Sequence, residues 1–111
     1  LAASEARWVA GRPGLAFELD SVRFRVLHPD TAWRGWSADV NDDSVILLVE
    51  YGGFRAVLAG DAGVAAEEAL RSRIGRVDLL KVGHHGSRTS SGASWLTELS
   101  PKLAIVSVGA E

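Results

Sequence analysis

A chain of 111 residues, with 47% hydrophobic and 23% charged side chains, has room for one globular domain with a modest core and is not disordered by composition. Its formal net charge of -2 excludes a protein that holds nucleic acid through a uniformly basic surface. The absence of cysteine excludes disulfides, thiolate metal sites and a cysteine nucleophile. No apolar run reaches the ~20 residues that a membrane-spanning helix needs.

Alternating apolar and polar residues in the first part of the chain indicate two half-buried strands. The alternation covers residues 15–19 and 22–26, which are joined by a tight turn at 20–21. A His-Pro-Asp tripeptide at 28–30 ends the second strand, because proline cannot donate a hydrogen bond to a neighbouring strand. We assign His28 a structural role.

The segment 31–43 lacks periodicity and is rich in polar residues, glycine and tryptophan. A loop of about a dozen residues is long enough to suggest a functional role. Trp33 and Trp36 either cover core surface or face a substrate, and covering the core is the more common role of a loop tryptophan.

The middle of the chain predicts a hairpin followed by a helix. Two apolar runs, 45–51 and 54–59, flank a Gly-Gly pair at 52–53 and predict a hairpin of largely buried strands. Residues 64–74 then show helical spacing, with Gly75 as the residue that follows the helix. The residues expected to face inward are Ala66, Ala69, Leu70 and Ile74. Those expected to face outward are Glu67 and Glu68.

The last third of the chain predicts strand, helix and strand. The strand covers 77–82, the short helix 91–99 ends before Pro101, and the final strand covers 103–108. Strands that alternate with helices pair in parallel through crossovers, with the helices over one face of the sheet. The predicted fold class is α/β (α+β), with a mixed β-sheet covered by helices.

Polar side chains gather where two of these strands end. Asp61 follows the strand at 54–59, and His84 and His85 follow the strand at 77–82. If these strands are neighbours, their carboxyl ends bring a carboxylate and an imidazole together, and such donors suit Zn²⁺, Mn²⁺ or Fe. Two alternatives stay open: Asp61 as the N-cap of the next helix, and the histidines as an exposed turn.

Other chemistry has little support in the sequence. There is no phosphate-binding P-loop, nucleophile elbow or dinucleotide-binding motif. One cluster of basic residues could form a local groove for an anionic partner, although a solvated face is the more common explanation. Its members are Arg71, Arg73, Arg76, Lys81 and Arg88.

Several motifs, taken in order, resemble one known family. They are Asn41-Asp42-Asp43-Ser44, Leu58-Ala59-Gly60-Asp61, the stretch 78–87 with its Lys-Val-Gly-His-His-Gly-Ser sequence, Thr89-Ser90-Ser91 and the segment 101–109. From about Leu15 to its end, the chain is similar to the metallo-β-lactamase-fold domain of ComEC-type competence DNA-uptake proteins. The stretch with the two histidines is the most specific of these motifs.

The resemblance implies half of an αββα sandwich, with residues 1–111 as a single partial domain, the C-terminal part. The family's His-x-His-x-Asp-His motif supplies most of the metal ligands and occurs nowhere in this chain. It normally lies N-terminal to the matching motifs. We therefore expect either that the upstream metal-binding half was cut away or that only this part was retained.

The same resemblance assigns roles to the polar residues. Asp61 would bridge two divalent metal ions, Zn²⁺ or Mn²⁺, and a histidine after the next strand would be the last ligand. His84 is favoured because it stands directly at the strand end, with His85 as the alternative. These three residues are the expected catalytic set. Residues expected to face the substrate or to support a ligand are Asn41, Ser44 and Ser87.

The implied function is a metal-dependent phosphodiesterase or nuclease domain that acts on DNA, as a single strand, during competence-linked uptake. Its partners would be this DNA, the remainder of its own domain, and the membrane through other domains of the parent protein. The implied location is the extracytoplasmic side of a cell-membrane protein, with a soluble cytoplasmic protein as the alternative. Two other functions stay open: a hydrolase of small phosphoesters, thioesters or lactones, and a non-catalytic folding or docking half-domain.

Overall fold

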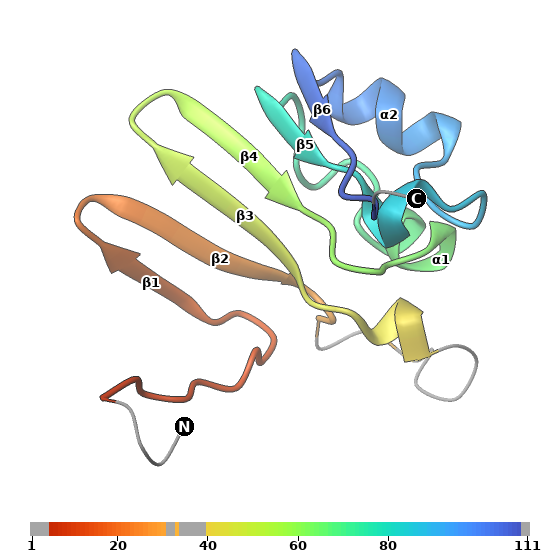
Figure 1. Ribbon diagram of the computed structural model, residues 1–111. Helices are drawn as coiled ribbons and strands as arrows, with labels where there is room; N and C mark the ends of the chain where they lie inside the picture. Colours follow the sequence, from red (N-terminus) through yellow and green to blue (C-terminus); the bar gives the residue numbers. More distant parts are fainter. Residues whose placement is uncertain (1–4, 31–32, 34–39, 110–111) are drawn as a thin grey trace.

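The strands of this protein form one mixed sheet in chain order. A computed structural model describes residues 5–30, 33 and 40–109, and in it a six-stranded sheet has the order β1-β2-β3-β4-β5-β6 (Figure 1). The strands are β1 (Ala16–Leu19), β2 (Val22–His28), β3 (Ile46–Tyr51), β4 (Phe54–Leu58), β5 (Leu79–Lys81) and β6 (Leu103–Ile105). The pairs from β1 to β4 are antiparallel, whereas β4, β5 and β6 are parallel. The predicted α/β (α+β) class with a mixed sheet is confirmed.

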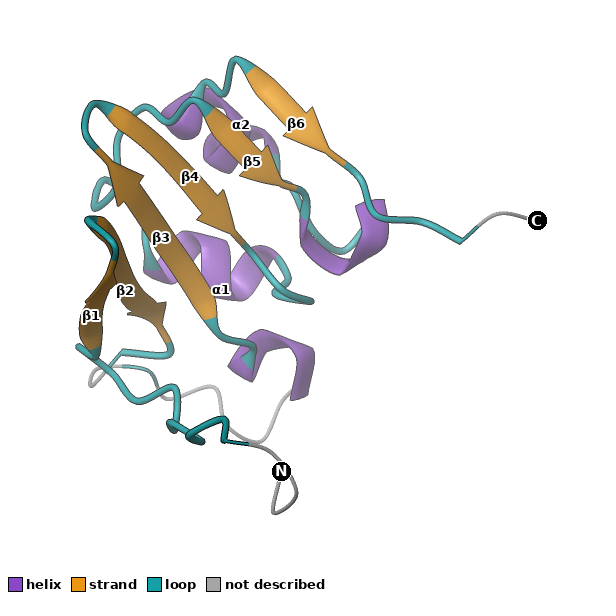
Figure 2. Cartoon of the chain, turned by 60° about the vertical axis from the view of Figure 1, so that its left-hand side comes forward, coloured by secondary structure: helices purple, strands orange, loops and turns teal. Residues whose placement is uncertain are grey.

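Two short helices make the parallel crossovers and cover one face of the sheet. Helix α1 (Val64–Ala69) lies between β4 and β5, and α2 (Ala93–Leu99) lies between β5 and β6, both on the same side (Figure 2). Two 3-10 helices flank them, η1 (Val40–Asp43) before β3 and η2 (Gly83–Gly86) after β5. The core therefore lies between one face of the sheet and the two α-helices.

The centre of the core is a row of side chains that the strand register aligns. Leu48 is opposite Val57, and Val57 is opposite Leu80, so all three point to the helix side of the sheet. Trp95 and Leu99 of α2 belong to the same buried cluster. Burying each such side chain stabilises the fold by roughly 1.5–3 kcal/mol.

The opposite face of the sheet is also apolar, and no described helix or strand packs on it (Figure 2). The register places one apolar residue of every strand in a continuous row: Phe17, Phe24, Val49, Ala56, Leu79 and Leu103. Phe17 and Phe24 stack with ring centroids 5.0 Å apart. The prediction that the first strand is half-buried is wrong, because all four residues of β1 are exposed.

The helix predicted at 64–74 is shorter than expected. It ends at Ala69 and is capped at Leu70, so Gly75 does not directly follow it, and Ala69 is exposed. The segment after it turns tightly at Ser72, which has a φ of 62°, and Gly75 also has a positive φ. The Glu98 carboxylate of α2 accepts hydrogen bonds from the backbone N–H groups of this turn. The donors are Ser72, Ile74 and Gly75.

These contacts change the acidity of Glu98. Burial raises the pKa of its carboxyl, but the backbone N–H groups together lower that pKa below its ordinary value. Where the sequence predicted the last turn of a helix, the structure has a tight turn whose backbone N–H groups are bound by the Glu98 side chain of α2.

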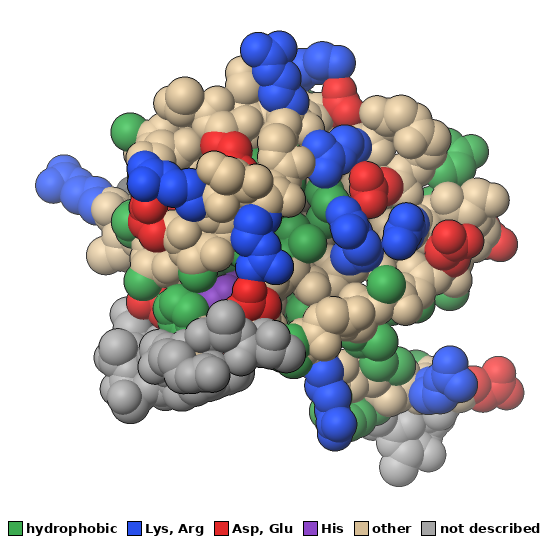
Figure 3. Space-filling view, turned by 180° about the vertical axis from the view of Figure 1, so that it is seen from behind, with side chains coloured by type: hydrophobic (Ala, Val, Ile, Leu, Met, Phe, Trp, Pro, Cys, Tyr) green, Lys and Arg blue, Asp and Glu red, His purple; other side chains and the backbone are tan. Residues whose placement is uncertain are grey.

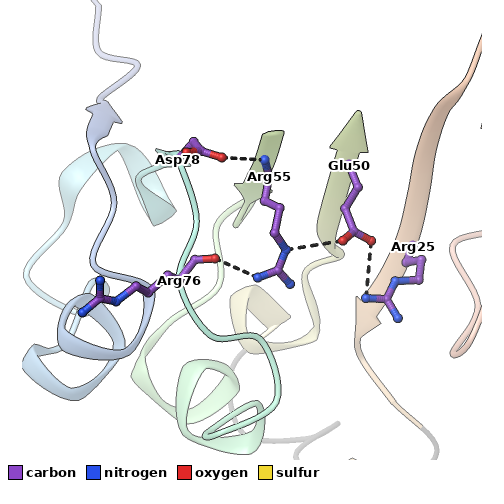
Figure 4. Close-up of polar contacts among 5 residues, drawn as sticks. All are labelled: Arg25, Glu50, Arg55, Arg76 and Asp78. Carbon is purple, nitrogen blue, oxygen red and sulfur yellow. Dashed lines mark hydrogen bonds and ion pairs between the residues drawn. The ribbon is translucent and has the colours of Figure 1, made fainter. Parts of the chain in front are cut away.

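A polar network ties together the strands at the end of the sheet near the β3–β4 turn. The Arg55 guanidinium contacts Glu50 at 3.3 Å and donates to the carbonyl of Arg76 at 2.7 Å (Figure 4). Arg25 contacts the same Glu50 carboxylate at 3.6 Å. The Asp78 carboxylate accepts the backbone N–H of Arg55 at 2.8 Å. The network therefore joins β2, β3 and β4 to the segment that leads into β5.

Two members of the basic cluster at 71–88 are paired with carboxylates. Arg71 pairs with Glu68, and Arg73 pairs with Asp30. Basic and acidic side chains are mixed over the face seen in Figure 3. Among the described residues, no helix has the length and apolar character needed to cross a bilayer.

Asp78 should make stability depend on pH. The hydrogen-bonded Lys102 ammonium and the Arg55 N–H hold the pKa of Asp78 below its ordinary value of 3.8. A lowered pKa adds stability above the ordinary value, and this is lost as the pH falls through the folded-state pKa. Asp78→Asn should therefore lower the free energy of unfolding at neutral pH, and the difference from wild type should shrink in acid. Urea unfolding at a series of pH values measures this, and an undiminished difference at pH 2 contradicts it.

Candidate functional site

Three loops meet at the carboxyl ends of β4 and β5. Asp61 follows β4, His84 and His85 follow β5, and Asn41 lies in η1 just before β3. Together they form a pocket of about 220 Å³. Its lining residues are Asn41, Asp42, Asp61, Gly63, Val64, Ala65, His84 and Thr89. The prediction that Asp61 and His84 converge at one edge of the sheet is confirmed.

Asp61 is not the cap of α1. The N-cap residue is Gly63, which makes no side-chain capping bond, so the alternative of a structural N-cap is wrong. Oδ1 of Asp61 instead lies 3.5 Å from Nε2 of His85, and the two side chains are 46% and 59% exposed. The carboxylate therefore faces an imidazole at the rim of the pocket.

His85 is oriented by the segment that follows β6. Its Nδ1 lies 2.7 Å from the carbonyl oxygen of Ser107, which can only accept, so Nδ1 carries the proton and donates it. In a neutral ring this leaves the lone pair on Nε2, the atom that faces Asp61. Metal-binding histidines commonly have this arrangement, in which the other ring nitrogen donates to a carbonyl.

His84 has a different environment. It lines the pocket, and its Nδ1 lies 3.4 Å from Oγ1 of Thr89. That hydroxyl is 3.0 Å from Oγ of Ser87, which places Ser87 behind Thr89 rather than in the pocket wall. The backbone N–H of His84 donates to the carbonyl of Gly60 at 2.9 Å, which joins the two loops that carry the candidate ligands.

The two histidines occupy a strained turn. His84 and His85 have φ values of 46° and 54°, and Gly86 continues the left-handed conformation at 79°. For residues other than glycine this region costs about 1–2 kcal/mol each, and it persists where the surroundings hold the backbone. His85 is exposed, as one alternative expected, but His84 is half-buried, and contacts with neighbouring segments fix the turn.

Two glycines allow the loops to approach closely. A Cβ on Gly83 would lie 2.9 Å from the carbonyl oxygen of Ala62, which is backbone and cannot easily move. A Cβ on Gly63 would lie 2.7 Å from a carboxylate oxygen of Asp42. Glycine at both positions therefore sets the distance between the β4 loop, the β5 loop and η1.

The 3-10 helix η1 is held from both sides. Oδ1 of Asp42 accepts the N–H of Gly63 at 3.0 Å, and the carbonyl of Asp42 accepts Nε2–H of His28 at 2.7 Å. His28 is fully buried, and its ring meets Trp33 edge-on, which confirms the structural role assigned to it. The Trp33 indole donates to Asp43 at 2.7 Å. Trp33 thus supports the loop, and Trp36 lies outside the described residues.

Of the two remaining predicted residues, one lines the pocket and the other lies beside it. Asn41 is in the pocket wall, whereas Ser44 lies against Gly60, just before Asp61. Sequence reasoning did not select Asp42 and Thr89 as site residues, although both line the pocket. The signal for Asp42 was its place between the two selected residues Asn41 and Ser44.

Glu67 corrects a further prediction. It was expected to face outward from α1, but it is only 3% exposed. Its carboxylate accepts the N–H groups of Ser91 and Gly92. Burial raises the pKa of Glu67 and outweighs these two N–H groups, which lower it. Helical spacing carries no signal for this contact, because the partners are more than twenty residues away in the chain.

The donors at the site suit a divalent ion but are few. A carboxylate oxygen and an imidazole nitrogen are the usual ligands of Zn²⁺ and Mn²⁺. Within residues 5–30, 33 and 40–109, no three His, Cys, Asp or Glu side chains are grouped so that they could hold an ion. The described residues therefore offer a facing carboxylate and imidazole, but no group of three such side chains.

Gly83→Ala should be costly because the new methyl group meets backbone. We expect it to lower the free energy of unfolding by about 1–3 kcal/mol, the usual range for an overpacked position. Gly53→Ala is the matched control, since a Cβ there has no neighbour within 4 Å, and it should change stability by less than about 0.5 kcal/mol. Urea unfolding of both variants is the measurement, and equal effects would contradict the close approach of the two loops.

Comparison with known proteins places the chain among longer relatives. No family model matches it. It is 35% identical over 98 residues to the ComE operon protein 3 of Bacillus subtilis, and 34% identical over 96 residues to the Recombination protein 2 of Haemophilus influenzae. It is 33% identical over 109 residues to the Competence protein ComA of Neisseria gonorrhoeae.

These alignments cover 86%, 86% and 96% of this chain, respectively, but only 12%, 12% and 14% of the three relatives. The chain is therefore related to one segment of competence-related proteins that are many times its length.

Proposed function

We propose that this chain is part of a metal-dependent hydrolase domain that cleaves phosphodiester bonds in DNA. The observation that carries the proposal is the pairing of Asp61 with His85. Their facing atoms lie 3.5 Å apart, and the second nitrogen of His85 is held by the carbonyl of Ser107. Two donors on one tetrahedral ion, with bonds of about 2.0–2.1 Å, lie about 3.3 Å apart, so the pair has room for a shared ion.

The geometry favours His85 over His84 as the ligand. The resemblance favoured His84 because it directly follows the strand, but only His85 has Nε2 facing Asp61 and Nδ1 on a carbonyl. His84 lines the pocket beside Thr89 and Asn41 and would contact the substrate there. When bound, a pair of divalent ions supplies an activated water and polarises a phosphoryl oxygen. The residues of this chain would hold Asp61 and His85 in place and shape the pocket.

The rest of the ligand set would come from other parts of the parent polypeptide. Two ligands cannot complete the shell of one ion, let alone two. The apolar row on the open face of the sheet, from Phe17 to Leu103, would pack against that same part of the protein. On this proposal residues 1–111 form one partial domain, and its first partner is the remainder of the domain.

DNA is the proposed substrate because of the relatives. One of them is named a competence protein and another a recombination protein. The proposed setting is uptake of a single strand by a protein of the cell membrane, with this domain on the extracytoplasmic side. The membrane would be reached through other domains of the parent.

A second candidate function follows from the lining of the pocket. None of its lining residues is Lys or Arg, and it carries the carboxylates of Asp42 and Asp61. A small phosphoester, thioester or lactone would therefore fit the pocket without a basic groove. Cleavage of such a compound, with no cleavage of single-stranded DNA, would favour this alternative.

Asp61→Asn tests the proposed ligand in the full-length parent protein. Loss of a group that merely supports a ligand commonly costs 10–100-fold in metal affinity, so loss of a ligand should weaken Mn²⁺ binding by at least about a hundredfold. His85→Ala should act similarly, whereas His84→Ala should affect DNA cleavage more than metal affinity. Asp20→Asn, in the β1–β2 turn, is the matched control. Calorimetric titration and a single-strand nuclease assay measure the two effects, and unchanged affinity in Asp61→Asn removes the metal site.

The 111-residue chain alone should bind divalent ions weakly and cleave nothing. Metal affinity follows ligand number and preformed geometry, and the described residues provide only a pair of facing donors. We expect at most one Zn²⁺ or Mn²⁺ per chain in a calorimetric titration, and no nuclease activity. Tight binding of two ions, or turnover that Asp61→Ala abolishes, would show that the site needs no further ligands.

A further inference from the structure

Glu67 is a buried carboxylate at the contact between the two helices. It lies on α1, is 3% exposed, and accepts two backbone hydrogen bonds from the segment that leads into α2. Ser91 donates to one oxygen at 2.5 Å, and Gly92 donates to the other at 2.9 Å. Burying a carboxylate is unfavourable unless hydrogen bonds replace its water, and both oxygens are used here.

The segment that Glu67 holds is the one that supports the histidine turn. Ser91, like the histidines, has a positive φ, of 57°. The hydroxyl of Ser90 donates to the carbonyl of Gly83 at 2.7 Å and is buried. Thr89 contacts His84 through its hydroxyl, and its carbonyl accepts the N–H of Val64 at 3.0 Å. Three consecutive residues therefore connect the carboxylate to the turn.

A second carboxylate provides a comparison within the same molecule. Glu98 of α2 accepts three backbone N–H groups from the turn after α1, just as Glu67 of α1 accepts two from the loop before α2. Both carboxylates fix a loop next to a helix, so both should contribute to stability. The loop that Glu98 fixes, at 72–75, includes none of the residues that line the pocket.

We propose that Glu67 is a positioning residue for the His84–His85 turn. Through Ser91 and Gly92 it holds the segment 89–91, and this segment fixes the strained backbone that presents the two imidazoles. The part of this proposal that concerns metal binding rests on the proposed function, whereas the part that concerns the position of the turn does not.

Glu67→Gln is the direct test. Glutamine has nearly the same shape but has one acceptor oxygen, and its NH₂ group would oppose a backbone N–H. The expected result is a change of chemical shift and line broadening for the imidazole signals of His84 and His85 in NMR spectra, with the His28 signals unchanged. In the full-length parent, affinity for Mn²⁺ should fall about tenfold, the lower end of the effect of residues that support a ligand. Glu98→Gln is the matched control and should leave both readouts unchanged.

Amide hydrogen exchange in the wild-type protein is an independent test that needs no variant. If Glu67 holds the turn, the N–H groups of Ser91, Gly92 and His84 open together and exchange with similar protection.

Glu67→Asp replaces Glu67→Gln in the NMR test if Glu67→Gln does not fold. It keeps the negative charge but shortens the side chain by one methylene. It should shift the same imidazole signals.

The outcomes separate the two proposals. Unchanged His84 and His85 signals in a folded Glu67 variant, or a His84 amide that opens independently of Ser91 and Gly92, overturn the positioning role. Equal shifts in Glu98→Gln also overturn it, because they would show a general loss of stability. If the full-length protein binds no Mn²⁺ while Glu67→Gln still shifts the histidine signals, the metal site fails and the positioning role stands.

Discussion

The close approach of the loops after β4 and β5 is the constraint on which the rest of the site depends. Parallel pairing of these strands brings both loops to the same edge of the sheet. The N–H of His84 then donates to the carbonyl of Gly60, and Gly83 lies so near the carbonyl of Ala62 that no side chain fits. Without this contact, Asp61 and the histidines would be separate polar groups on separate loops.

Much of the fold could be predicted because its signals are local. Period-two alternation, a Gly-Gly turn and a proline mark the strands and their ends, and the order of elements predicts the parallel half. The end of α1 and the burial of Glu67 could not be predicted in this way. Each depends on a hydrogen bond between residues more than twenty positions apart: the N–H of Ser72 donates to Glu98, and the N–H of Ser91 donates to Glu67. The exposure of β1 could not be predicted for a different reason. Strand alternation indicates which face of a strand is apolar, but not whether another part of the protein covers that face.

The candidate site also has one feature that the sequence could predict and one that it could not. The convergence of Asp61 with a histidine follows from topology, and the sequence was sufficient to predict it. Which histidine faces Asp61 depends on the φ angles of two adjacent residues and on the carbonyl of Ser107, which arrives only after β6. Position directly after a strand favoured His84, but a left-handed backbone turns successive side chains in directions that strand alternation does not describe.

The arrangement of contacts around the histidine turn also bears on how an ion would bind. A flexible loop must be ordered when it binds a ligand, and that loss of entropy weakens the affinity. Here the folded chain already orders the turn through Gly60, Ser90 and Ser107, before any ligand is involved. The strain of two left-handed histidines is likewise offset by contacts formed on folding. If Asp61 and His85 hold an ion as proposed, the histidine turn is ordered before the ion binds, so the number of ligands rather than the ordering of this turn would limit affinity.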